Sequence, residues 1–170
     1  MLSLAAQALS RCLPDTTRTD YNWHFQEAPH NLFDLDFQNP PIVLDYRTGR
    51  ENRRLIIGSG KTGTVVALDA RRGQLVWRAS VGKHQNDKLQ SYGAEGVDVY
   101  PGSLGGIIAP IAYAGDNLYV PTVNWGRHYY PGSAAPGLIG AAGTGELIAL
   151  NLADGSEHWK IALRLHLTAA

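Results

Sequence analysis

The sequence predicts an all-β fold of short strands joined by tight turns, and three observations support this prediction. The 170 residues include 19 glycines and 9 prolines, a composition that suits many strands and turns. No segment after residue 25 repeats its apolar residues every ~3.6 positions, as an amphipathic helix would. A strand–turn–strand pattern also occurs twice, at a fixed separation along the chain.

The repeated pattern covers residues 63–77 and recurs at residues 145–159, 82 positions later. Both copies read G-x-apolar-apolar-A-L-[DN]-x-x-x-G-x-x-x-W. The apolar run predicts a strand, the Asp or Asn caps the backbone of a turn, and the second glycine supplies the positive φ that the turn requires. The closing residues, Trp77 and Trp159, fall on the return strand, where each ring is predicted to pack between neighbouring sheets.

Other short apolar runs predict the remaining strands. Residues 54–58 lead into the first copy of the repeat, and residues 117–121 lead into the second. Residues 42–45 precede a turn at 47–49, and residues 111–113 follow a glycine-rich approach. Short strands with frequent turn signals indicate an all-β fold, and this pattern alone leaves a sandwich or a barrel open.

Two stretches between the repeats are predicted to be surface loops. Residues 83–103 and 126–143 contain Gly, Pro, Tyr and Asn, and they lengthen the spacing between the two repeat tryptophans. The four histidines at 84, 128, 158 and 166 have no metal-ligand spacing with one another, so they are interpreted as surface or packing residues. The aromatic residues Trp125, Tyr129 and Tyr130 are expected to pack within their own loop, and the alternative is that they line a sugar or alcohol pocket.

Charge and composition exclude several functions. The chain has 15 basic and 15 acidic residues, so its formal net charge is zero and gives no electrostatic case for a nucleic-acid or anionic-membrane partner. Cys12 is the one cysteine, so no disulfide forms within the chain. No run approaches the ~20 apolar residues of a membrane span. Residues 1–20 lack a basic start and a small-residue cleavage site, so they are interpreted as a lead-in rather than a signal peptide, and residues 21–170 as the β domain.

The segment WHFQEAPHNLFDLD at residues 23–36 is the richest in chemistry. Asp34 and Asp36 are two positions apart, so an extended backbone points both carboxylates to the same side. Two such anions repel unless a cation or hydrogen-bond donors share them. Calcium would suit two carboxylate ligands, and a solvated or turn-capping role is the alternative.

Lys61 lies in the turn Gly-Ser-Gly-Lys-Thr-Gly at residues 58–63. A phosphate-binding loop would need four residues between its glycines and a helix after its lysine, whereas a strand is predicted to follow here. Nucleotide binding is therefore not expected. A solvated turn lysine remains the alternative to a functional one.

The repeat resembles the tryptophan-docking motif of β-propellers of the pyrroloquinoline-quinone (PQQ) type. That resemblance implies propeller blades of four-stranded antiparallel sheets, with Trp23 standing where a preceding blade would place its tryptophan. Propellers close their ring with ~4–8 blades, and about three fit in this chain. The ring is therefore expected to be incomplete, with further blades supplied by another chain or by a longer parent.

The segment at 23–36 resembles W-x-x-Q-x-x-P-H-D-x-W-D-x-[DA] of PQQ-dependent alcohol dehydrogenases. The matched residues are Trp23, Gln26, Pro29, His30 and Asp34. The resemblance implies PQQ with calcium or a lanthanide as cofactor, an alcohol or sugar as substrate, and a periplasmic or extracellular location.

The same resemblance implies a role for each of three charged residues. Asp34 would be the catalytic base that takes the alcohol proton while hydride passes to the quinone, and it would also bind the metal. Asp36 resembles the extra metal ligand of the lanthanide-using branch. Lys61 resembles the cation that contacts the quinone oxygens, where it would stabilise developing negative charge.

The chain also departs from the dehydrogenase pattern. Asn31 and Phe33 replace an Asp and a Trp, and the pair Ile108–Ala109 stands where the family segment G-G-x-N-W-x-P has Asn-Trp. The upstream metal ligands, the Trp beneath the quinone and the vicinal cysteines have no counterparts here. The chain alone is therefore expected to be inactive, and the alternative function is a non-catalytic scaffold like the assembly-factor propellers of bacterial outer membranes.

Overall fold

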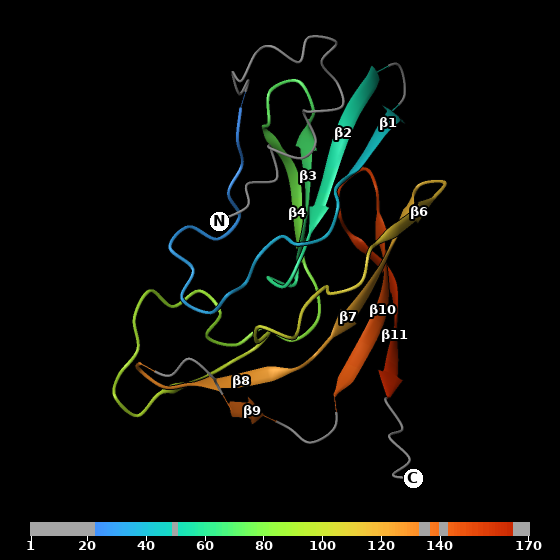
Figure 1. The fold of residues 1–170 in the computed structure, drawn as a ribbon. Coiled ribbons are helices and arrows are strands. Elements are labelled where there is room, and N and C mark those ends of the chain that lie inside the picture. Colours follow the sequence, from blue (N-terminus) through green and yellow to red (C-terminus); the bar gives the residue numbers. More distant parts are fainter. Residues whose placement is uncertain (1–22, 49–50, 133–136, 140–142, 165–170) are drawn as a thin grey trace.

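The computed structural model describes residues 23–48, 51–132, 137–139 and 143–164, and these form strands, turns and extended segments with no helix (Figure 1). The predicted all-β class is therefore confirmed for this part of the chain. The predicted lead-in at residues 1–20 lies outside the described residues. Among the described residues, no helix is long and apolar enough to cross a membrane.

The first sheet has the order β1-β2-β3-β4, and every neighbouring pair is antiparallel. Its strands are β1 (Ile42–Thr48), β2 (Glu51–Ser59), β3 (Thr64–Asp69) and β4 (Leu75–Ser80). β3 and β4 are the predicted hairpin, and Gly73 adopts a φ of 66° in the turn between them. The pleat places Leu55, Ile57, Val65 and Ala67 on one face and Ile56, Val66 and Leu68 on the other.

The second sheet has the order β11-β10-β7-β6 and repeats the first in outline. Its strands are β6 (Ala112–Ala114), β7 (Asn117–Val123), β10 (Thr144–Asn151) and β11 (Glu157–Arg164). The register of the hairpin shifts between Ala149 and Leu150, and the first hairpin shifts between the equivalent residues Ala67 and Leu68. The two hairpins therefore share the same sequence repeat and the same register shift.

A third sheet was not predicted. The strands β5 (Val97–Val99), β8 (Gly126–Tyr129) and β9 (Gly137–Ile139) pair in the order β5-β8-β9 at one end of the two larger sheets (Figure 1). The prediction that residues 83–103 and 126–143 are only loops is wrong for these strands. Each is three or four residues long, too short for an alternating pattern to stand out in the sequence.

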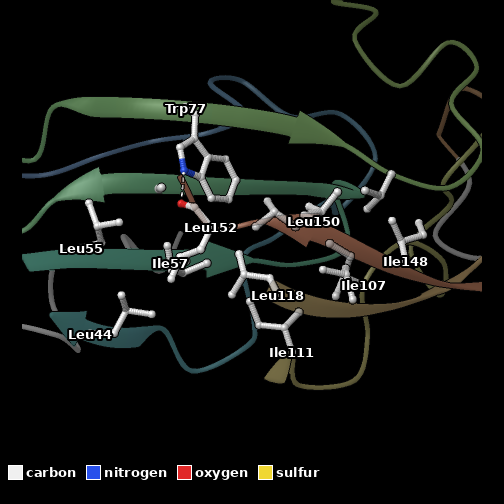
Figure 2. Close-up of a cluster of buried hydrophobic side chains, with 14 residues drawn as sticks. Leu44, Leu55, Ile57, Trp77, Ile107, Ile111, Leu118, Ile148, Leu150 and Leu152 are labelled. Atoms are coloured by element: carbon white, nitrogen blue, oxygen red, sulfur yellow. Dashed lines mark hydrogen bonds between the residues drawn. The ribbon is translucent and has the colours of Figure 1, made fainter. Parts of the chain in front are cut away.

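One apolar core joins the two four-stranded sheets (Figure 2). Side chains from the facing surfaces of both sheets interdigitate there, among them Ile57, Trp77, Leu118, Ile148, Leu150 and Leu152. The sheets therefore share a core, and the part of the chain that the structure describes does not close a ring. This arrangement confirms the prediction of unclosed blades of four antiparallel strands.

The repeat tryptophans differ in their surroundings. Trp77 is 7% exposed, its ring lies against Gly155, and its Nε1 donates a hydrogen bond of 2.9 Å to the Leu152 carbonyl (Figure 2). Trp159 is 37% exposed, so the prediction that it is buried between sheets is wrong. The reason is that no further sheet in the described part of the chain covers β11.

Candidate functional site

In the segment before β1, the side chains of residues 33–36 alternate between the interior and the solvent. Phe33 and Leu35 are 1% and 4% exposed, whereas Asp34 and Asp36 lie on the solvent side. The two carboxylates share one side, as the sequence predicts. The predicted cause, an extended backbone, does not hold at Asp34, which has a left-handed φ of 58°.

Local hydrogen bonds hold this segment in shape. The side-chain oxygen of Asn31 accepts from the amides of Phe33 and Leu35, each at 2.9 Å. The Tyr129 hydroxyl donates to the Phe33 carbonyl at 2.9 Å, and the two rings pack with their centres 4.8 Å apart. Asp34 has a φ of 58°, a left-handed conformation that Asp tolerates better than most residues. The backbone at Asp34 is thus fixed on both sides.

Lys61 reaches the same place from the turn between β2 and β3. Its amide donates to the Asp36 carbonyl at 2.8 Å and to the Gln38 side-chain oxygen at 3.0 Å. Gly60 must be glycine here, because a Cβ would lie 2.2 Å from the Asp36 carbonyl oxygen. The turn and the segment therefore touch through their backbones, and this contact aims the Lys61 side chain.

The Lys61 ammonium lies between the two carboxylates. Its Nζ is 2.9 Å from Oδ2 of Asp34 and 3.8 Å from Oδ2 of Asp36. The Lys61 side chain is 19% exposed, while those of Asp34 and Asp36 are 65% and 52% exposed. Such exposed ion pairs contribute little to the free energy of unfolding. What they provide is a positive charge held next to two negative charges. The catalytic, cofactor-binding and metal-binding roles of these residues stay predictions.

A glycine-rich loop closes the other side of the Lys61 turn. Gly106 packs against the Lys61 carbonyl, and the Ile107 amide donates to the Gly60 carbonyl at 3.0 Å. Asn39, 6% exposed, donates to the Ile107 carbonyl at 2.8 Å. This is the loop in which Ile108 and Ala109 replace Asn-Trp, and Ile108 is 44% exposed. The departure from the dehydrogenase pattern therefore lies beside Lys61.

The described residues do not form a metal centre by themselves. They contain no group of three or more His, Cys, Asp or Glu side chains placed to hold one ion. Asp34 and Asp36 offer carboxylate oxygens, but calcium takes ~6–8 oxygen ligands. A metal ion bound by Asp34 and Asp36 would therefore need further ligands.

Sequence reasoning missed a polar pocket next to this site. It has a volume of about 280 Å³ and lies between the 27–35 segment, β4 and the loop after it, and its lining includes Glu27, Arg78 and Asp87. Glu27 pairs with Arg78 at 2.7 Å, yet burial raises the pKa of its carboxyl above the usual value. No sequence spacing joins these three residues.

Sequence reasoning also missed two histidine–carboxylate pairs. His84 Nδ1 lies 2.6 Å from Asp87, and His128 Nδ1 contacts Asp98 across β5 and β8. The spacing His-x-x-Asp was a possible signal only for the first pair.

Two protein-family models match the chain. One is described as outer membrane protein assembly factor BamB and matches residues 61–170. The other is described as the glucose/ethanol/alcohol dehydrogenase β-propeller domain and matches residues 15–80, which include Asp34 and Lys61.

Curated relatives include quinoprotein dehydrogenases. The quinohemoprotein alcohol dehydrogenase of Comamonas testosteroni is 29% identical over 80 residues, which cover 42% of this chain and 11% of that protein. The quinoprotein glucose dehydrogenase of Escherichia coli (strain K12) is 33% identical over 54 residues, which cover 32% of this chain and 7% of that protein. The chain thus spans about a tenth of the length of the curated relatives it matches.

Solved structures share the fold. The crystal structure of the Comamonas testosteroni enzyme matches with a TM-score of 0.66 and 17% identity, over 86% of this chain and 27% of that one. A europium-containing methanol dehydrogenase matches with a TM-score of 0.65 and 20% identity, over 86% of this chain and 31% of that one. At these identities the likeness concerns the fold alone.

Proposed function

The chain belongs to the PQQ-repeat β-propeller family, and from that premise we propose that it is the catalytic-base portion of a quinoprotein dehydrogenase that oxidises an alcohol or sugar hydroxyl. The names of the curated relatives, alcohol and glucose dehydrogenases, support the substrate class. A periplasmic or extracellular location is part of the same proposal. Turnover would require further blades beyond those described.

The placement of the Lys61 ammonium between Asp34 and Asp36 carries the proposal. Asp34 would accept the hydroxyl proton of the substrate, because its side chain is open to solvent and its carboxylate is held by Lys61. Lys61 would put a fixed positive charge where negative charge develops on an oxygen of the cofactor. When bound, PQQ would supply the hydride acceptor.

The residues offer one cation to the quinone and two carboxylates to a metal. The Lys61 ammonium can donate a charge-assisted hydrogen bond to a quinone oxygen, and a metal cation would offset the repulsion between the two carboxylates and an anionic cofactor. Asp34 and Asp36 would contribute to a calcium or lanthanide site only as part of a ligand set shared with the cofactor and other residues.

Calorimetric titration of PQQ into the complete propeller, with calcium and in parallel with a lanthanide, tests the proposal. We expect saturable binding that Lys61→Ala weakens. In the complete propeller, Asp34→Asn should lower turnover of an alcohol by ~10²–10⁴-fold, the usual contribution of a general base. The matched control is Asp116→Asn, which changes an exposed acid in the β6–β7 turn. PQQ binding that is indifferent to both Lys61→Ala and Asp34→Asn would refute the proposed site.

A scaffold function is the second candidate, and two observations favour it. The assembly-factor model matches the larger part of the chain, residues 61–170. Ile108 and Ala109 also replace the Asn-Trp pair beside Lys61. A scaffold predicts that the complete propeller takes up no PQQ at any metal concentration, so the same titration separates the two functions.

A further inference from the structure

The polar pocket beside the candidate site is a separate space, and we call it the Glu27 pocket. The segment before β1, strand β4 and the loop after β4 form its walls, and its volume is about 280 Å³. Leu35 and Thr62 line it, and each directly follows a member of the Asp34–Lys61 ion pair. The lining within the described residues includes neither Asp34 nor Lys61. The pocket and the candidate site therefore share two stretches of backbone but no charged side chain.

Two carboxylates of the pocket are largely buried, and each has its own cation. The side chains of Glu27 and Asp87 are 10% and 12% exposed. Arg78 contacts Oε2 of Glu27 at 2.7 Å, and Nδ1 of His84 contacts Oδ2 of Asp87 at 2.6 Å. Each contact uses one oxygen of the carboxylate. The other oxygen can accept a hydrogen bond from a ligand.

The charges in the lining balance without a ligand. Glu27 and Asp87 supply two negative charges, and Arg78 and Lys88 supply two permanent positive charges. Lys88 is near enough to Glu27 for its charge to favour the ionised carboxylate. An ionic ligand would lose its hydration and find no surplus of opposite charge to compensate for the loss. The balance of charge therefore favours a ligand that is itself neutral.

The lining is also rich in groups that exchange hydrogen bonds with hydroxyls. Hydroxyl and amide side chains, which can both donate and accept, come from Thr62, Thr64, Ser80, Asn31 and Gln90. The hydrogen bonds between Thr62 and Thr64 are 3.3 and 3.4 Å long, so both hydroxyls can form shorter ones with a ligand. Leu35 and Leu89 add apolar surface. This mixture suits a molecule that carries several hydroxyl groups on a carbon ring.

The size of the pocket limits the ligand further. Its volume of about 280 Å³ lies just below the ~300–1,000 Å³ of pockets that take drug-sized molecules. We propose that the Glu27 pocket binds a neutral polyhydroxylated molecule of monosaccharide size, such as a sugar or a cyclic polyol. Because Leu35 and Thr62 line the pocket, this ligand would restrain the two backbone stretches that carry Asp34 and Lys61. Its binding does not depend on PQQ.

Titration of D-glucose into the full chain, followed by methyl NMR, tests the proposal. The methyl signals of Leu35, Thr62 and Thr64 should shift saturably, with a dissociation constant of ~1–10 mM for a neutral ligand of this size. The methyl of Thr122, a buried residue of β7 outside the lining, should not shift. Glucuronate and glucosamine, the anionic and cationic relatives of glucose, should each bind at least about tenfold more weakly, because the pocket has no charge to offer them.

Three substitutions locate the bound sugar. Glu27→Gln should weaken glucose at least about tenfold, since it removes a charged acceptor, whereas Glu95→Gln, an exposed acid outside the lining, should leave the affinity unchanged. Ser80→Tyr places a ring in the pocket from an exposed position on β4, so it should abolish binding without disturbing the core. Asp34→Asn should have no effect, because Asp34 is not part of the lining.

Three results would overturn the proposal. The first is no saturable shift of the Leu35 and Thr64 signals with glucose. The second is tighter binding of glucuronate or glucosamine than of glucose, because the pocket would then serve an ion. The third is an affinity for glucose that falls with Asp34→Asn and not with Glu27→Gln, which would place the sugar at the Asp34–Lys61 pair. That third result would leave the proposed dehydrogenase function intact, and a failure of PQQ to bind would leave the Glu27 pocket intact.

Discussion

At the scale of single residues, the Tyr129 hydroxyl connects the third sheet to the candidate site. It donates to the Phe33 carbonyl and accepts from the Ser103 amide at 3.1 Å, while Phe33 immediately precedes Asp34. The sequence could not reveal this contact, because the two partners are 96 positions apart. The expectation that Tyr129 packs within its own loop is therefore wrong.

Removing that hydroxyl should loosen the backbone at Asp34 without emptying the core. Tyr129→Phe keeps the ring against Phe33 but leaves a buried carbonyl unsatisfied, so we expect a loss of ~1–3 kcal/mol in unfolding free energy. PQQ affinity should fall as well, if Asp34 and Lys61 bind it. Urea denaturation and calorimetric titration measure the two effects. Tyr130→Phe is the matched control, because Tyr130 is 52% exposed, and an equal effect of both changes would contradict this account.

At the scale of elements, the strands that sequence reasoning found are those with strong local signals. The hairpins β3–β4 and β10–β11 were predictable because the apolar run, the Asp or Asn and the turn glycine are adjacent in sequence. Within the described residues, the strands β5, β8 and β9 pair with one another and with no other strand, and β5 and β8 are far apart in the chain. Their pairing depends on tertiary contacts that no local pattern encodes.

Hydrogen bonds of the His84 side chain hold the loop that leads from β4 to β5. Its Nδ1 faces Asp87, and its Nε2 lies 3.2 and 3.3 Å from the carbonyl oxygens of Val81 and Gly63. Both ring nitrogens therefore face acceptors, which favours the doubly protonated ring. The hydrogen bond to Asp87 raises the pKa of His84 above its usual value of about 6.5.

The hydrogen bonds of His84 should make the free energy of unfolding depend on pH. The pKa of His84 is higher in the folded state than in the unfolded state. Its contribution to the free energy of unfolding is therefore fully present below the unfolded-state pKa, and it is lost as the pH rises through the folded-state pKa. The difference in unfolding free energy between the wild type and His84→Gln should therefore be largest below about pH 6.5 and shrink above it. Urea denaturation across this range measures the difference. A difference that grows with pH would show that the charged ring is not the stabilising form.

At the scale of the whole molecule, Trp77 connects the two four-stranded sheets, because it packs in their common core and hydrogen-bonds to the Leu152 carbonyl. Trp77→Ala should cost ~3–5 kcal/mol, as for other large core aromatics, and should destabilise both sheets together. Hydrogen exchange should show amides of β3 and β10 losing equal protection. Trp159→Ala, at 37% exposure, should cost much less in the same chain. Loss of protection confined to β3 would mean that the sheets unfold separately.

The repeat predicted that Trp77 and Trp159 stand at equivalent positions, and the register of both hairpins agrees. Burial could not be predicted in the same way. It depends on whether a neighbouring sheet is present, which is a property of the assembly and not of the repeat.

The segment that begins at Trp23 also runs on to Asp34, so one stretch of chain both covers the first sheet and forms the candidate site. Trp23 rests on the turn at Gly73, and eleven positions later Asp34 meets Lys61. A ligand held between Asp34 and Lys61 would restrain the same stretch and so favour the docked position of Trp23. The part of the tryptophan emission that Trp23→Phe removes should therefore report the occupancy of a site that Trp23 does not touch.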